Sequence, residues 1–429
     1  MHQPTSSSDI ERLYSKVTRR IVPLLVLGYI AAYLDRVNVG FAKLQMLEDL
    51  NFSQTVYGFG AGIFFIGYFL FEVPSNMVLH RIGARRWLAR IMISWGIISA
   101  SMMFVSTPAS FYVLRFLLGA AEAGFFPGVI YYLTQWYPGA RRARIIALFM
   151  TGVAICSFAG SLISGAIMQM FDGVSGLAGW QWLFLLEALP AIGIGAYYLA
   201  RLTDNIESAS WLKPEEKRVL ASQLLHEEAG KSEGTFKTAF RDPRVWLCCL
   251  IYFCCASGLY GLSFWLPTIV ADMGVKNAFE VGVLTAIPYA VAAVGMVLVG
   301  RSSDRSGERR WHFAVPAALG GLGLIVSVQF AHVHVIALAG LTLATFGVLS
   351  ASPMFWNFPT AFLKGAAAAA GIAIINSIGN LAGFLIPFVV GWIKDATNST
   401  GNGMYLIAAL LVSGAILALV AKFPKAPDS

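Results

Sequence analysis

Four charged residues stand inside long apolar stretches of the sequence: Asp35 and Arg36 in the first stretch, and Arg115 and Glu122 in the fourth. An ionisable side chain at the centre of a bilayer costs a few kcal/mol. Asp35 lies about fourteen residues into its stretch, roughly 21 Å along a helix, and Arg36 projects about 100° around the helix from it. Arg115 and Glu122 are two turns apart on one helical face. We expect the four to line one polar cavity.

The residue types suggest separate roles in that cavity. Arg36 carries a planar fork of donors that matches a carboxylate bidentately. Asp35 and Glu122 are carboxylates on which burial and neighbouring arginines act in opposite directions, so each could load a proton on one side and release it on the other. Arg115 could hold Glu122 or Asp35 when either is deprotonated. In the alternative interpretation, all four form ion pairs that hold this part of the protein together.

Other polar residues in apolar stretches give weaker signals. Tyr68 could hydrogen-bond a ligand or simply pack. Asn376 and Asn380 are four residues apart on one helical face, where an amide in contact with lipid would be expensive, so they could contact a ligand or neighbouring helices. Glu72 and Glu187 are interpreted as structural, without an assigned role.

The elements that must position these residues follow from composition. The chain has 429 residues, of which 57% are hydrophobic and only 13% charged. A soluble domain carries roughly a quarter charged residues. Twelve apolar runs are long enough to span a membrane as helices. We predict an all-α membrane protein with spans at residues 21–42, 56–79, 87–106, 109–132, 144–168, 181–200, 245–270, 280–300, 312–331, 334–357, 368–390 and 403–421.

A hydrophilic segment divides the chain near its middle. We predict an N-terminal six-helix half at 1–200, a cytoplasmic linker loop at 201–243 and a C-terminal six-helix half at 244–429. The motif Gly83-Ala84-Arg85-Arg86-Trp87 recurs as Gly307-Glu308-Arg309-Arg310-Trp311, in each half after the second span. Parallel repeats of this kind are typical of transporters whose halves rock around a central site.

The basic residues predict the orientation. Of the 31 Lys and Arg residues, only Lys43, Lys276 and Lys394 fall in the expected outside loops, and Arg36, Arg90 and Arg115 lie within or at the edge of spans. All the others fall on the side that carries both termini. By the positive-inside rule, both termini are cytoplasmic in a multi-pass protein of the bacterial inner membrane.

The loop motif at residues 301–311 resembles that of the major facilitator superfamily, although His80-Arg81 in the first copy replaces the usual Asp-Arg. Three further segments resemble the anion:cation symporter branch: Tyr33 to Asn38, Phe71 to Asn76, and Arg115 to Glu122 with Phe126-Pro127-Gly128. The resemblance implies two pseudo-symmetric six-helix halves and a proton-coupled symporter that imports a small organic carboxylate, such as a sugar acid, a tartrate-like acid or an aromatic acid.

By the same resemblance, Arg36, Tyr68, Trp356 and Asn376 match substrate-contact positions, and Asp35 and Glu122 match proton-coupling positions, beside Arg115. The alternative is an exporter of metabolites or drugs on the same fold. We expect no enzyme and no cofactor, because no nucleophile–base pair, metal cluster or phosphate loop is present. Basic residues in short clusters argue against nucleic acid. The expected partners are a small organic anion, protons and membrane lipid, and we expect a functional monomer.

Overall fold

The computed structural model describes residues 7–228, 240–363 and 365–421, and over these residues the chain is helical. Twelve of its helices or helix pairs are long and apolar enough to cross a membrane. The twelve predicted spans are therefore confirmed, and each predicted range overlaps one of them. The first six spans are α1 (Ser7–Leu50), α2 (Gln54–Ile82), α3 (Ala84–Ser101), α4 (Pro108–Glu122) with α5 (Phe125–Thr134), α6 (Gly139–Met170) and α7 (Gly179–Arg201).

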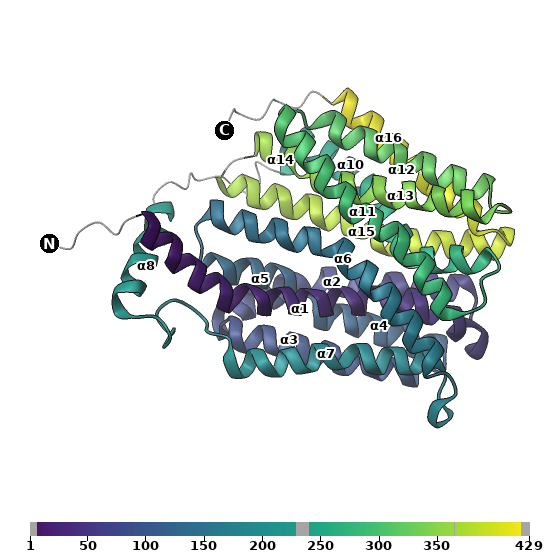
Figure 1. The fold of residues 1–429 in the computed structure, drawn as a ribbon, viewed down its shortest axis with the longest axis horizontal. Helices are drawn as coiled ribbons and strands as arrows, with labels where there is room; N and C mark the ends of the chain where they lie inside the picture. Colours follow the sequence, from purple (N-terminus) through teal and green to yellow (C-terminus); the bar gives the residue numbers. More distant parts are fainter. Residues whose placement is uncertain (1–6, 229–239, 364, 422–429) are drawn as a thin grey trace.

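The last six spans form a second group of the same kind. They are α10 (Pro243–Asp272), α11 (Ala278–Ser306), α12 (Arg310–Gln329), α13 (His334–Phe355) with α14 (Asn357–Phe362), α15 (Gly365–Thr397) and α16 (Thr400–Val420). Between the two groups lies α8 (Pro214–Glu228), where Glu216 accepts a hydrogen bond from Lys16 Nζ at 2.8 Å. Figure 1 shows the two groups side by side, with α8, the start of α1 and the end of α16 at the same end of the bundle.

The two groups meet along three helix pairs, α1 with α10, α2 with α15, and α6 with α11. The approach of α2 to α15 depends on glycine. A Cβ atom on Gly58 would lie 2.2 Å from Pro387 O, and one on Gly62 would lie 2.5 Å from Phe384 O. Small residues let helix backbones come into direct contact. These two positions bring the helices together near the end of the bundle opposite α8 and the start of α1, here called the far end.

Hydrogen bonds also join the two groups at the far end. Asp395 on α15 accepts hydrogen bonds from the backbone N–H groups of Gln54 and Thr55, at 3.1 and 2.7 Å, and so caps the first turn of α2. Tyr57 Oη donates to Phe264 O at 3.0 Å. A carboxylate at a helix N-terminus satisfies N–H groups that the helix cannot. The far end is therefore closed by contacts between the two groups.

Lys43 is a correction to the sequence analysis. We expected it in an outside loop, but α1 continues to Leu50 and Lys43 is buried within it. Its Nζ atom lies 3.3 Å from the centre of the Trp265 ring and 4.6 Å from that of Tyr57. An ammonium group over aromatic faces is held by the ring quadrupole. The aromatic partners come from distant helices, so sequence alone did not indicate them.

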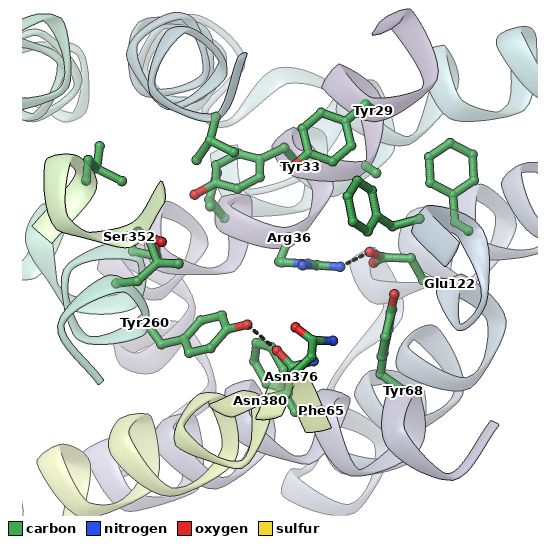
Figure 2. A pocket seen from close by; sticks show the side chains of 18 of the residues that line it. Tyr29, Tyr33, Arg36, Phe65, Tyr68, Glu122, Tyr260, Ser352, Asn376 and Asn380 are labelled. Atoms are coloured by element: carbon green, nitrogen blue, oxygen red, sulfur yellow. Dashed lines mark hydrogen bonds and ion pairs between the residues drawn. The ribbon is translucent and has the colours of Figure 1, made fainter. Parts of the chain in front are cut away.

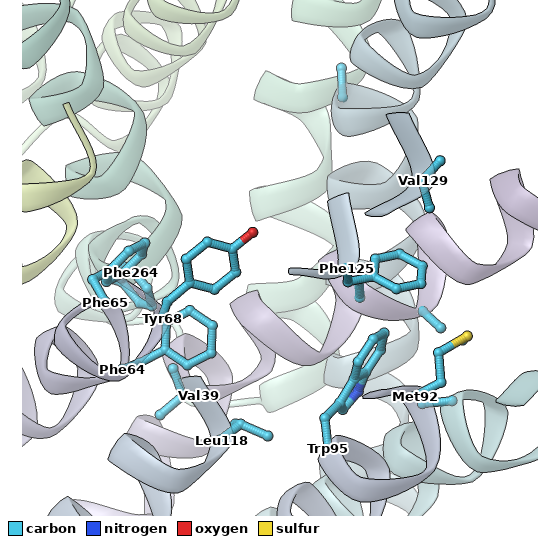
Figure 3. Close-up of a cluster of buried hydrophobic side chains, with 14 of the residues drawn as sticks. Val39, Phe64, Phe65, Tyr68, Met92, Trp95, Leu118, Phe125, Val129 and Phe264 are labelled. Atoms are coloured by element: carbon cyan, nitrogen blue, oxygen red, sulfur yellow. The ribbon is translucent and has the colours of Figure 1, made fainter. Parts of the chain in front are cut away.

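The fourth span is broken rather than continuous. Gly124 has a φ of 86°, in the left-handed region that favours glycine, and it separates α4 from α5. Glu122 is consequently the last residue of α4. Next to the break, Phe125 packs edge to face on Trp95, with ring centres 5.3 Å apart. Figure 3 shows this contact and, across from it, the aromatic residues of α2 that pack toward Phe264.

Candidate functional site

A cavity lies between the two groups of spans, near the middle of the bundle. Side chains from α1, α2, the α4–α5 break and α6 form one side of its wall, and side chains from α10, α11, α13 and α15 form the other. Its empty volume is about 1270 Å³, counting the part that is open to solvent. Aromatic rings and a few polar groups face this space (Figure 2). Such a combination is typical of small-molecule sites.

An ion pair crosses the cavity wall. Arg36 Nη2 donates a hydrogen bond to Glu122 Oε1, which joins the middle of α1 to the end of α4. Figure 2 shows the guanidinium group pointing toward this carboxylate. The Arg36 side chain is 25% exposed and that of Glu122 only 3%. Arg36 and Glu122 are the charged residues among those that the structure describes along the wall, so a ligand would meet the guanidinium first.

Asp35 does not lie on this wall, and the expectation that four charges share one cavity is wrong for it. Asp35 is buried, 1% exposed, between α1 and α3. Ser99 Oγ and Asn38 Nδ2, the latter at 3.2 Å, both donate to its Oδ1 atom. Successive helical residues project about 100° apart. Because Arg36 points into the cavity, Asp35 points into the interior of the first six spans.

Arg115 is also behind the wall, fully buried. Its Nε and Nη2 atoms donate to the backbone oxygens of Gly60 and Ala61, at 3.3 and 3.2 Å. Seven residues place it about 10 Å nearer the far end than Glu122. The expected pairing of Arg115 with Glu122 or Asp35 is absent among the described contacts, because Arg36 takes Glu122. The ring of Phe64 lies between the two guanidinium groups: its centre is 5.5 Å from Arg36 Cζ and 5.0 Å from Arg115 Cζ.

The other predicted contact residues all line the cavity. Tyr68 lies with its ring centre 5.6 Å from Arg36 Cζ. Trp356, directly after α13 ends, packs on Tyr252 with ring centres 4.8 Å apart. Asn376 and Asn380 both face the cavity from α15. Their contact with a substrate stays a prediction.

Several wall residues escaped the sequence analysis. Tyr29 and Tyr33 precede Arg36 on the cavity face of α1, at spacings of four and three residues that put all three on one helical face. On α10, Tyr260 Oη donates to Asn380 Oδ1 at 2.8 Å and so fixes that amide. The spacing on α1 was a usable signal. The pairing of Tyr260 depends on helix packing and gave none.

The two acids without an assigned role lie away from the wall. Glu72 is half-buried on α2, one turn beyond Tyr68. Glu187, on α7, is buried and accepts a hydrogen bond from Ser164 Oγ at 2.6 Å. Neither lines the cavity.

The described residues contain no group of three or more His, Cys, Asp or Glu side chains placed to hold a metal ion. All five cysteines are free and buried. The cavity presents a guanidinium group, paired with a carboxylate and surrounded by aromatic rings and amides.

Comparison with known proteins agrees with this arrangement. The sequence model of the Major Facilitator Superfamily matches residues 25–387. A protein of Agrobacterium vitis named as a tartrate transporter is 50% identical over 96% of this chain and 92% of its own length. A quinolone resistance transporter of Acinetobacter baumannii is 42% identical over 94% and 93%. The crystal structure of a D-xylose–proton symporter has the same fold, with a TM-score of 0.75, 14% identity, and coverage of 95% of this chain and 98% of that one.

The family model covers most of the chain, the relatives match it almost end to end, and twelve spans in two packed groups surround a central cavity. The family and these relatives are transporters, not enzymes. The chain belongs to the major facilitator superfamily.

Proposed function

We propose that the protein is a proton-coupled symporter that imports a small organic carboxylate by alternating access. The observation that carries this proposal is the ion pair between Arg36 and Glu122 on the cavity wall. A substrate carboxylate and the Glu122 carboxylate compete for the same guanidinium group. When Glu122 takes up a proton, its charge is lost and Arg36 can bind the substrate bidentately.

Charge balance ties the two events together. The empty site is neutral, because Arg36 pairs with Glu122. The site with one proton and one monoanion is neutral as well. A proton without substrate, or substrate without a proton, leaves a net charge in the cavity, and an unpaired charge away from water is strongly disfavoured. Only the two neutral states close readily, so the carrier moves substrate and proton together.

We infer that the structure represents an inward-facing state. Asp395 and the glycines of α2 close the far end. If the termini are cytoplasmic, as the positions of the Lys and Arg residues indicate, the far end faces outward. Rocking of residues 1–200 against 244–429, with 201–243 as the cytoplasmic linker, would open it. A C-terminal fluorescent protein that matures only in the cytoplasm tests this orientation; absence of fluorescence in an inserted protein would contradict it.

We propose that the substrate is a small acid that carries either further polar groups or a flat ring. Tyr68, Asn376 and Asn380 offer hydrogen bonds for hydroxyl groups, and Trp356 offers a ring face. The relative named as a tartrate transporter supports a hydroxy acid. A thermal-shift screen of the purified protein against tartrate, galactonate, phthalate, hydroxyphenylacetate and nicotinate would identify the class.

The proposal is tested by uptake of the best-stabilising acid into proteoliposomes with an imposed pH gradient. Arg36→Ala should abolish binding, and Arg36→Lys should weaken it, because an ammonium group cannot bind a carboxylate bidentately. Glu280→Gln, at an exposed position on α11, serves as the matched control for loss of a charge. Uptake that ignores the pH gradient in the wild type, or full affinity in Arg36→Ala, would refute the proposal.

One observation favours a second candidate, an exporter on the same site. The relative from Acinetobacter baumannii is named as a quinolone resistance transporter. An exporter would exchange protons for substrate rather than move both in one direction. In proteoliposomes with an acidic interior, a symporter expels the labelled acid and an exchanger accumulates it, so the direction of movement separates the two.

A further inference from the structure

Lys43 lies two helical turns beyond Arg36 on α1, toward the far end. A step of seven residues returns a side chain to nearly the same face of a helix and moves it about 10 Å along the axis. On that face Arg36 points into the cavity (Figure 2). Lys43 is therefore the next cation along the side of α1 that faces the second group of spans.

Two aromatic rings cover Lys43, and one of them belongs to the second group of spans. The Nζ atom lies 3.3 Å from the ring centre of Trp265 on α10 and 4.6 Å from that of Tyr57 on α2. Lys43 is 3% exposed, and its Nζ atom has no hydrogen-bond partner among the described residues. Lys394 at the far end, by contrast, pairs with Asp272 at 3.0 Å. Lys43 is thus held by rings and not by a carboxylate.

Packing alone does not require a cation at this position. Taking a charged group out of water is costly, and well-packed apolar side chains often replace a buried ion without loss of stability. An unbranched methionine would fill a similar space against the two rings. The amine of Lys43 is therefore better explained by a second state of the protein, in which the ring of Trp265 has moved away.

Rocking of the two groups produces such a state. The helices α1 and α10 form one of the pairs along which the groups meet. Opening of the far end carries Trp265 away with α10, while Tyr57 moves together with Lys43. The amine then faces the route from the far end to Arg36. Both cationic side chains are long and flexible, so they can reach one small anion from positions about 10 Å apart on the helix.

We propose that Lys43 is a second cationic contact for the carboxylate substrate while the far end is open. This inference rests on the proposed function and adds a contact to the same bound anion. Two cations hold the acid in the open state, and Arg36 alone holds it once Trp265 covers Lys43 again. The affinity for the acid therefore falls as the far end closes, which favours release on the opposite side.

The test measures the dissociation constant by calorimetric titration, with the far end open and with it shut. The ligand is the acid that stabilises the protein most in the thermal-shift screen. Gly58→Val and Asp395→Ala disrupt different contacts at the far end, and labelling of Ser263→Cys from outside verifies that it has opened. A bifunctional maleimide that joins Thr55→Cys to Asp395→Cys holds it shut, because these two side chains are in contact.

Lys43→Met should weaken binding about tenfold in both open backgrounds, the loss expected for one hydrogen bond to a charged group. With the far end held shut, the same change should alter the dissociation constant less than about twofold, because Trp265 already covers the amine. Lys43→Arg keeps a cation and should stay within about threefold of the open form with lysine. Lys276→Met removes an exposed cation between α10 and α11. This matched control should leave binding unchanged in every background.

An unchanged dissociation constant for Lys43→Met, in an open background that is labelled at Ser263→Cys, would overturn the inference; the proposed function still stands if Arg36→Ala abolishes binding. Equal weakening in the open and the shut backgrounds would also overturn it, because a packing defect acts in both. If Lys43→Met weakens only the open form but no pH gradient drives uptake, the proton coupling fails and the role of Lys43 stands, since the titration needs no gradient.

Discussion

Glu122→Gln preserves the size of a side chain on the cavity wall and removes its charge, so Arg36 loses its ion-pair partner. Under the proposed mechanism, a carboxylate entering the wild-type cavity gains Arg36 only when Glu122 is protonated. At pH values where Glu122 is ionised, each further unit of pH should therefore weaken binding about tenfold, or about 1.4 kcal/mol. In the variant the guanidinium group is available at every pH, and this dependence should disappear.

The size of the gain at high pH follows from the burial of the pair. Removing one partner of a buried ion pair costs about 3–5 kcal/mol, because the other charge is left alone. The Arg36 side chain is 25% exposed, so water reduces that cost, and we take about 3 kcal/mol as the upper limit. A bound carboxylate recovers most of it. The variant should accordingly bind the acid up to about 100-fold more tightly than the wild type under alkaline conditions.

Two assays on the same protein preparation test the role of Glu122. Calorimetric titration of the acid across the pH range gives the affinity, and proteoliposomes give exchange and net uptake separately. We expect Glu122→Gln to exchange internal for external acid yet fail to concentrate it against a gradient, while Glu280→Gln behaves as the wild type. A variant that keeps the tenfold loss per pH unit, or that concentrates the acid as steeply as the wild type, would refute the role given to Glu122.

Three further variants probe the interior and the far end. Asp35→Asn should bind the acid but lose concentrative uptake in a pH gradient; accumulation equal to the wild type would remove Asp35 from coupling. Asp395→Ala removes a carboxylate that accepts two backbone hydrogen bonds across the two groups. An impermeant maleimide should therefore label Ser263→Cys, on the α10 side of the cavity wall, about tenfold faster from outside; an unchanged rate would contradict the role of Asp395 in closing the far end. Gly58→Val would place a Cβ atom 2.2 Å from Pro387 O. Uptake should fall below about a tenth of the wild-type rate, although the protein still inserts and binds the acid. Uptake near the wild-type rate would mean that α2 and α15 need not come into contact there.

The fold was largely predictable because the signals that specify it are local. A run of about twenty apolar residues and the positions of Lys and Arg are properties of the sequence itself. The departures come from tertiary contacts. Lys43 directly follows a predicted span, yet it lies inside α1 with its Nζ atom over the rings of Trp265 and Tyr57. The break at Gly124 was equally hidden, since one glycine in an apolar run does not by itself indicate a left-handed residue.

The sequence predicted which residue types form the site, but not how each helix is rotated about its own axis. Charges in apolar segments identified Arg36 and Glu122, which do meet across the cavity wall. The same reasoning grouped Asp35 with them, although a step of one residue turns its side chain toward α3. A sequence gives the angle between two neighbours and not which of them faces the cavity. Glu187 shows the same limit, because Ser164, which donates a hydrogen bond to it, comes from another helix.

In the proposed coupling, the charges of four residues set how many protons a substrate requires: Asp35, Arg36, Arg115 and Glu122. The two arginines oppose the two acids, so these four charges balance. One proton on Glu122 leaves room for one negative charge. A dicarboxylate brings two, so neutrality requires a second proton, and Asp35 is the remaining ionised acid that can accept it. In Asp35→Asn these four positions carry one excess positive charge when the site is empty, which lowers the charge cost of admitting a monoanion before Glu122 takes up its proton. The loss of coupling expected for that variant is therefore a consequence of charge balance, although Asp35 never touches the substrate.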